Sequence, residues 1–121
     1  MPESNFILLQ GNADIERQLL SALSHASGHV HATRCMDQLR EQIEKTRVNG
    51  VVVDMETVSL GEIEKFVRDF PGVTLVCNHR IADDELWTAA MNVGATDCCD
   101  SRDMRGILSA LRTPRRLHAA A

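Results

Sequence analysis

Apolar residues alternate along the chain between short compact blocks and longer segments in which they recur every three or four positions. The compact blocks predict five short strands, and the segments with the wider spacing predict five amphipathic helices. The predicted strands are residues 6–9, 29–33, 51–53, 73–77 and 98–99. Because each predicted strand is followed by a predicted helix across a short loop, the pattern indicates an α/β fold with a parallel sheet.

Each predicted helix has an apolar stripe and a polar residue or turn at its ends. The stripes are Ile15, Leu19, Leu20 and Leu23; Leu39 and Ile43; Ile63, Phe66 and Val67; Leu86, Ala89, Ala90 and Val93; and Met104, Ile107, Leu108 and Leu111. Gly28 and the pair Pro71–Gly72 end two of the helices, Gly61 opens the third, and Asp103 starts the fifth.

The block Val51–Val53 is the centre of the prediction, because three consecutive β-branched residues must be covered on both faces. We therefore place it in the middle of a doubly wound, flavodoxin-like (βα)5 sheet with strand order 2-1-3-4-5. The more polar residues 29–33 then lie at a sheet edge. Asp54 follows the valines directly, at the carboxyl edge where open parallel sheets bind ligands.

The length of 121 residues fits one domain, which we expect over residues 1–113, with residues 114–121 as a linker or tail after Pro114. No apolar run approaches the roughly 20 residues that cross a bilayer, and the first ten residues do not resemble a signal peptide. We expect no membrane association and a cytoplasmic protein.

The formal net charge of −4 argues against wholesale binding of nucleic acid. The charge is unevenly distributed, because residues 1–100 are acidic and residues 101–121 hold five arginines against one aspartate. The basic end has two open interpretations: a contact with nucleic acid or an acidic partner, or a solvated helix face that leads to an output domain outside this chain.

Cysteine and histidine offer two further hypotheses. The four cysteines lack the pattern of a secreted disulfide scaffold, so we expect reduced core thiols. Cys77 is either a redox-sensitive thiol near Asp54 or a small residue at the edge of the core. His29 and His31 share one face of a strand and, with Cys35, form either a sparse metal site or a polar sheet edge.

The chain resembles a response-regulator receiver (CheY-like) domain over nearly its whole length. The resemblance is carried by the strand at residues 6–9, by Val51–Val53 with Asp54, and by residues 86–97, an alanine-rich helix followed by a Gly-Ala-Thr-Asp turn. It implies that Asp54 stands where receivers accept a phosphoryl group. In receivers, two acidic residues after the first strand hold the Mg²⁺ ion that assists this transfer.

The chain departs from the receiver pattern around that position. Gly11 and Asn12 stand where the resemblance implies the acidic pair, and Ser101 stands where it implies a lysine. The hydroxyl and aromatic switch positions of strands four and five correspond to Cys77 and Cys98.

These departures imply an atypical receiver whose Asp54 is a solvated carboxylate, open to hydrogen bonds from backbone N–H groups, in a pocket that binds Mg²⁺ weakly or not at all. Glu56 is the one further carboxylate nearby. We expect no enzymatic activity and no cofactor, with Mg²⁺ needed only if phosphorylation is retained. The expected function is signalling or transcriptional regulation through protein contacts, largely independent of phosphorylation. The alternative is a phosphoacceptor that a histidine kinase phosphorylates on Asp54.

The expected partners are an output domain, a kinase or a second copy of the chain, with nucleic acid bound only through an absent output domain. Helix four, strand five and helix five form the face by which receivers pair, and here that face carries Trp87, Arg102, Arg105 and Arg112. Complementary charges on the same face predict a weak homodimer.

Overall fold

The computed structural model describes residues 5–26 and 28–112 of the chain. In this range five strands alternate with five helices. The strands are β1 (Asn5–Leu9), β2 (His29–Thr33), β3 (Gly50–Asp54), β4 (Thr74–His79) and β5 (Asp97–Asp100). The helices are α1 (Ala13–Ala26), α2 (Met36–Lys45), α3 (Leu60–Asp69), α4 (Asp84–Asn92) and α5 (Met104–Leu111). The predicted tail at residues 114–121 lies outside the described residues.

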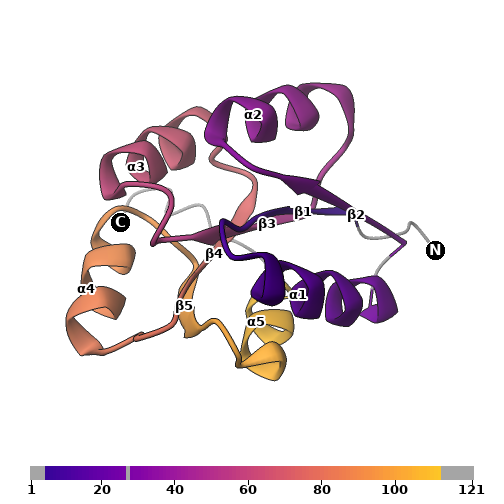
Figure 1. Ribbon diagram of the computed structural model, residues 1–121. Coiled ribbons are helices and arrows are strands. Elements are labelled where there is room, and N and C mark those ends of the chain that lie inside the picture. The colour runs from indigo at the N-terminus through magenta and orange to yellow at the C-terminus, as the bar shows by residue number, and fades with distance from the viewer. Residues whose placement is uncertain (1–4, 27, 113–121) are drawn as a thin grey trace.

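The strands form one parallel sheet in the order β2-β1-β3-β4-β5, which confirms the predicted topology (Figure 1). The register aligns Leu9 with Val53, and Asp54 with Asn78. The strand β2 is an edge strand, as its polar composition indicated. The winding reverses between β1 and β3, so the carboxyl ends of these two strands flank the crevice where such sheets place their ligands.

The valine strand β3 is covered on both faces. Val51 and Val53 pack in the core beneath α2, α3 and α4, whereas Val52 packs with α1 and α5 on the opposite face. Figure 1 shows α2 and α3 above the sheet, with α1 and α5 below it. All three valines are fully buried. The β-branched run therefore forms the centre of both cores, as predicted.

The ends of three helices follow simple capping rules. Ser59 and Glu62 form a capping box at the start of α3, so this helix begins at Leu60 rather than at Gly61. Asp83 and Asp103 cap α4 and α5 by accepting hydrogen bonds from Leu86 N and Gly106 N. These caps fix the loops that leave β3, β4 and β5, and these loops surround Asp54.

Candidate functional site

Asp54 ends β3 at the carboxyl edge of the sheet, as predicted, but its side chain is not solvated. Only 2% of the residue is exposed. Its Oδ2 accepts hydrogen bonds from Gly11 N (3.1 Å) and Thr57 Oγ1 (2.7 Å), and its Oδ1 accepts one from Glu56 N (2.9 Å). The expected hydrogen bonds from backbone N–H groups are therefore present, but the expectation of solvation is wrong, because two backbone amides and a hydroxyl have taken the place of water.

The Thr57 hydroxyl lies so close to Gly11 that a side chain at position 11 would displace it. A Cβ atom built there would lie 2.3 Å from Thr57 Oγ1 and 3.5 Å from Asp54 Oδ2. The space beside Asp54 that a side chain at position 11 would enter is thus filled by the threonine hydroxyl.

A second group of buried polar side chains lies next to Asp54 and carries no formal charge. Gln10 Nε2 donates to Asn78 Oδ1 (3.0 Å), and Ser101 Oγ donates to the same oxygen (2.8 Å). Asn78 Nδ2 donates in turn to the carbonyl of Val53 (3.3 Å). Gln10, Asn78 and Ser101 are each at most 1% exposed. They join the carboxyl ends of β1, β3, β4 and β5 through neutral hydrogen bonds.

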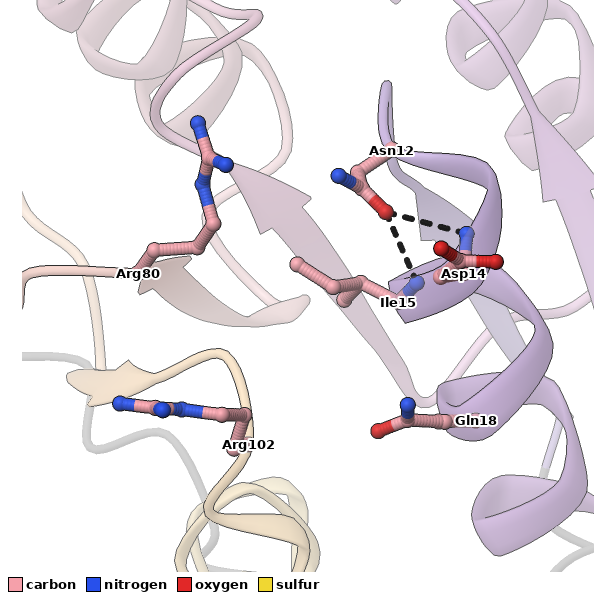
Figure 2. Close-up of a pocket in the computed structure, with 6 residues that line it drawn as sticks. All are labelled: Asn12, Asp14, Ile15, Gln18, Arg80 and Arg102. Carbon is pink, nitrogen blue, oxygen red and sulfur yellow. Dashed lines mark hydrogen bonds between the residues drawn. The ribbon is translucent and has the colours of Figure 1, made fainter.

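Asn12 follows β1 and lies at the start of α1, where a polar side chain can cap the helix. Its Oδ1 accepts hydrogen bonds from Asp14 N (3.0 Å) and Ile15 N (3.1 Å), so it caps α1 (Figure 2). The two residues directly after β1 are Gln10 and Gly11, and they contact Asn78 and Asp54. The side-chain oxygen of Asn12 is therefore engaged by the helix, and the correspondence of Gly11 and Asn12 to an acidic pair stays a prediction from the receiver resemblance.

Glu56 is the other carboxylate of the small pocket beside Asp54. This pocket has a volume of about 210 Å³ and is lined by Gly11, Asn12, Asp54, Glu56, Thr57 and Arg80. Arg80 binds Glu56 through both Nε and Nη2, at 2.8–3.1 Å. These hydrogen bonds lower the pKa of Glu56 below its usual value of 4.5. The second carboxylate of the pocket thus has its own cation within the chain.

A neighbouring pocket of about 340 Å³ lies between α1 and the loops after β4 and β5. Figure 2 shows Ile15 and Gln18 on the α1 side, with Arg80 and Arg102 across from them and the guanidinium group of Arg102 pointing away from α1. Arg102 binds Asp100, the last residue of β5 (3.2 Å), and its hydrogen bonds lower the pKa of that carboxyl. Both arginines that line this pocket thus bind a carboxylate of the chain, Arg80 that of Glu56 and Arg102 that of Asp100.

Three of the four cysteines are buried, in agreement with the expectation of core thiols. The expectation that Cys77 ends strand four is wrong, because β4 continues to His79 and Cys77 pairs with Val53 inside the sheet. Burial raises the pKa of Cys77, raises that of Cys98 to about 11 and raises that of Cys99 to about 12. Protonated, buried thiols are poor nucleophiles, which disfavours the redox hypothesis for Cys77. Cys98 Sγ lies 3.6 Å from the sulfur of Met55.

The face formed by α4, β5 and α5 exposes an apolar and basic surface. Trp87 is 47% exposed and donates through its indole nitrogen to Asp97 (3.2 Å), while Ile81 in the preceding loop is 69% exposed. Arg105 and Arg112 are also exposed. Trp87 therefore lies on the surface of this face rather than in the core.

Sequence reasoning missed four residues that build the site: Gln10, Thr57, Asn78 and Arg80. One signal was available for Gln10 and Asn78, since polar residues interrupt apolar blocks where strands end and their side chains meet at one sheet edge. Thr57 and Arg80 lie in loops, and their contacts depend on loop geometry that the hydrophobic pattern does not encode.

Two negative findings apply to the described residues. Within residues 5–26 and 28–112 there is no group of three or more His, Cys, Asp or Glu side chains that could hold a metal ion. His29, His31 and Cys35 therefore do not form such a group. In the same part of the chain, no helix combines the length and the apolar character needed to cross a membrane.

Comparison with known proteins gives a result at the level of structure only. No protein-family model matches the sequence, and no curated protein sequence matches it either. Many solved structures do match. A signal receiver domain of an HD domain-containing protein from Pseudomonas fluorescens Pf-5 is similar with a TM-score of 0.78 and 19% identity, over 92% of this chain and 93% of that one.

Two further solved structures with a similar fold are response regulators. An orphan response regulator of H. pylori matches with a TM-score of 0.76 and 13% identity, over 90% of this chain and 97% of that one. A response regulator from Burkholderia pseudomallei, whose structure has a phosphorylated aspartic acid and a calcium ion, matches with a TM-score of 0.76 and 19% identity, over 91% of this chain and 67% of that one. The chain therefore has the flavodoxin-like (βα)5 fold of response-regulator receiver domains.

Proposed function

We propose that this chain is an atypical receiver domain of a two-component-type signalling or transcription-regulatory protein. It acts by binding other proteins, with little dependence on phosphorylation and without catalysis of its own. The observation that carries the proposal is the state of Asp54, which is 2% exposed and accepts hydrogen bonds at both carboxyl oxygens from Gly11, Glu56 and Thr57.

The chemistry of aspartyl phosphorylation explains why this state matters. A carboxyl oxygen must reach the phosphorus atom of the donor, and cations must neutralise the charge that develops on the phosphoryl oxygens. Here Asp54 Oδ2 is covered by Gly11 and Thr57, and the carboxylate of Glu56 is bound to Arg80. The residues around Asp54 therefore fit Mg²⁺ poorly, because this ion requires accessible oxygen ligands in near-octahedral geometry.

The position that the receiver resemblance gives to a lysine supports the same proposal. Ser101 stands there, is fully buried and donates its hydroxyl hydrogen to Asn78. A hydroxyl that is held in a neutral network supplies no cation for a phosphoryl group. In our proposal the Gln10–Asn78–Ser101 network keeps this edge of the sheet in one arrangement.

The alternative function is that of a phosphoacceptor, phosphorylated on Asp54 by a histidine kinase. It is favoured by one observation, the location of Asp54 at the carboxyl end of β3 beside a pocket of about 210 Å³. For this function the hydrogen bonds from Thr57 and Gly11 must open, and Mg²⁺ must enter the pocket.

The proposed partners are proteins: an output domain, a kinase or a second copy, with nucleic acid reached only through an output domain outside this chain. The contact surface of the proposal consists of Trp87, Arg102, Arg105 and Arg112. Within the chain, Asp100 already binds Arg102 and Asp97 already binds Trp87. Self-association through this face is therefore expected to be weak and to depend mainly on apolar contact, since exposed ion pairs contribute little.

The proposal is tested by incubating the chain with acetyl phosphate and Mg²⁺ and measuring its intact mass, with an established phosphorylatable receiver treated in parallel. We expect no phosphoryl adduct, and sedimentation that does not change with the donor. An adduct that requires Mg²⁺ and disappears in Asp54→Asn would establish the alternative. An adduct-free chain whose self-association tightens with the donor would also contradict the proposal.

A further inference from the structure

We propose that Thr57 is the positioning residue that closes the Asp54 pocket, and that Gly11 lacks a side chain because the Thr57 hydroxyl occupies that space. The inference rests on the proposed function and adds its physical cause. Residues 11 and 57 come from different loops, yet a Cβ at position 11 and Thr57 Oγ1 would lie only 2.3 Å apart. A side chain at position 11 and a hydroxyl bound to Asp54 therefore exclude each other.

The hydroxyl of Thr57 is the one side-chain donor to Asp54 within the described part of the chain. It lies 2.7 Å from Oδ2, the shortest of the three hydrogen bonds to this carboxyl group. The other two donors, Gly11 N and Glu56 N, belong to the backbone, so no side-chain substitution deletes them. The cover over Asp54 Oδ2 thus depends on a single side chain that substitution can remove.

The loop that carries Thr57 is anchored independently of this hydroxyl. The backbone amides of Thr57 and Val58 both donate to the carbonyl of Asp54, at 3.1 and 2.9 Å. Val58 is 4% exposed and packs in the core, and Ser59 caps α3 one residue later. Removal of the Thr57 hydroxyl is therefore expected to leave the loop backbone where it is and to uncover Asp54 Oδ2.

The opened site would face the pocket that Gly11, Asn12 and Arg80 line together with Glu56. Without the hydroxyl, Oδ2 retains one donor, Gly11 N, and has a free lone pair toward solvent. The side chain of Thr57 thus decides whether Asp54 can react with molecules from solution.

Two substitutions, one at position 57 and one at position 11, are expected to break the hydrogen bond between Thr57 Oγ1 and Asp54 Oδ2. Thr57→Ala removes the hydroxyl. Gly11→Ala introduces the Cβ that would displace it, and the backbone at position 11 accepts alanine because its φ is not positive. Thr57→Ser keeps the hydroxyl and is the conservative control, and Gly72→Ala is the control for adding a methyl group, since no atom lies within 4 Å of its Cβ position.

The test is labelling of the folded chain with a water-soluble carbodiimide and glycinamide, which converts accessible carboxyl groups into amides, followed by peptide mass spectrometry. We expect Asp54 to be protected in the wild type, in Thr57→Ser and in Gly72→Ala, and labelled at least about fivefold faster in Thr57→Ala and Gly11→Ala. Labelling at Glu64, an exposed carboxylate on α3, calibrates the reagent in each sample.

The outcomes separate this inference from the proposed function. If Asp54 of the wild type is labelled as readily as Glu64, the closed carboxyl group on which the proposed function rests is absent. If the wild type is protected and Thr57→Ala remains equally protected, the proposed function stands and the role of Thr57 is refuted. Circular dichroism of each variant confirms that labelling reports a folded chain, and Gly11→Ala provides a second route if Thr57→Ala fails to fold.

Discussion

The side-chain amide of Gln10 donates to the side-chain oxygen of Asn78 across 3.0 Å, and this hydrogen bond joins two residues 68 positions apart in a fully buried setting. Gln10 follows β1, and Asn78 lies near the end of β4. These strands are not neighbours, since β3 lies between them. The hydrogen bond therefore passes over the end of β3, next to Asp54, and links the residue after β1 to the next-to-last residue of β4.

Substitution of Asn78 tests this link. Asn78→Ala leaves the amide of Gln10 and the hydroxyl of Ser101 buried without their acceptor, so we expect it to lower the free energy of unfolding by about 2–3 kcal/mol. Urea denaturation measures the change. Gln18→Ala, at an exposed position on α1, is the control and is expected to change stability by less than about 0.5 kcal/mol. An equally small change for Asn78→Ala would mean that the hydrogen bonds among Gln10, Asn78 and Ser101 contribute little to the free energy of unfolding.

The topology was predictable because few arrangements satisfy the hydrophobic pattern. The consecutive Val51–Val53 require cover on two faces, and right-handed crossovers with one reversal then give the order 2-1-3-4-5. The polar residues 29–33 fit only a sheet edge. Helix ends were less well predicted, since the start of α3 is fixed by the capping pair Ser59 and Glu62 rather than by Gly61.

The site was predictable in its location but not in its contacts. Asp54 lies where the pattern placed it, yet its closure depends on Thr57, whose hydroxyl reaches it only because the loop turns back over the strand end. The end of the fourth strand was also misjudged by two residues, since β4 continues to His79. Asn78 rather than Cys77 lies beside Asp54, because alternate residues of a strand face opposite sides and a shift of one exchanges core and edge positions.

The role of Asn12 as a helix cap leads to a separate prediction. Asn12→Ala removes the acceptor of two amides at the start of α1 and is expected to cost about 1 kcal/mol of stability. Asn12→Asp keeps an acceptor oxygen and places negative charge at the helix N-terminus, so it is expected to cost nothing. Thermal or urea unfolding of both variants distinguishes this role from that of a metal ligand. Equal stability of Asn12→Ala and the wild type would contradict it.

The ion pair between Glu56 and Arg80 predicts a dependence of stability on pH. Because the hydrogen bonds from Arg80 lower the pKa of folded Glu56 below 4.5, the pair stabilises the fold above that pH. The contribution is lost as the pH falls from 4.5 through the lower pKa of the folded chain. Urea unfolding at pH 7 should therefore show Glu56→Gln to be less stable than the wild type, with a gap that closes toward pH 3. A gap that widens in acid would refute this assignment.

The cysteines predict selective alkylation. Cys35 is exposed, whereas Cys77, Cys98 and Cys99 are buried and have raised pKa values. At pH 8, iodoacetamide should modify Cys35 of the native chain and modify the other three only after denaturation. Peptide mass spectrometry gives the extent at each position. Rapid native modification of Cys77 would revive the redox hypothesis.

The most direct test of the central claim is an amide NMR titration of the chain with Mg²⁺ and beryllofluoride, a mimic of the phosphoryl group. The reporters are the backbone amides of Gly11 and Glu56, because both donate to the carboxyl oxygens of Asp54. A closed, phosphorylation-independent receiver predicts that both resonances stay in place throughout the titration. Saturable shifts of these two amides in the wild type, absent from Asp54→Asn, would contradict that account.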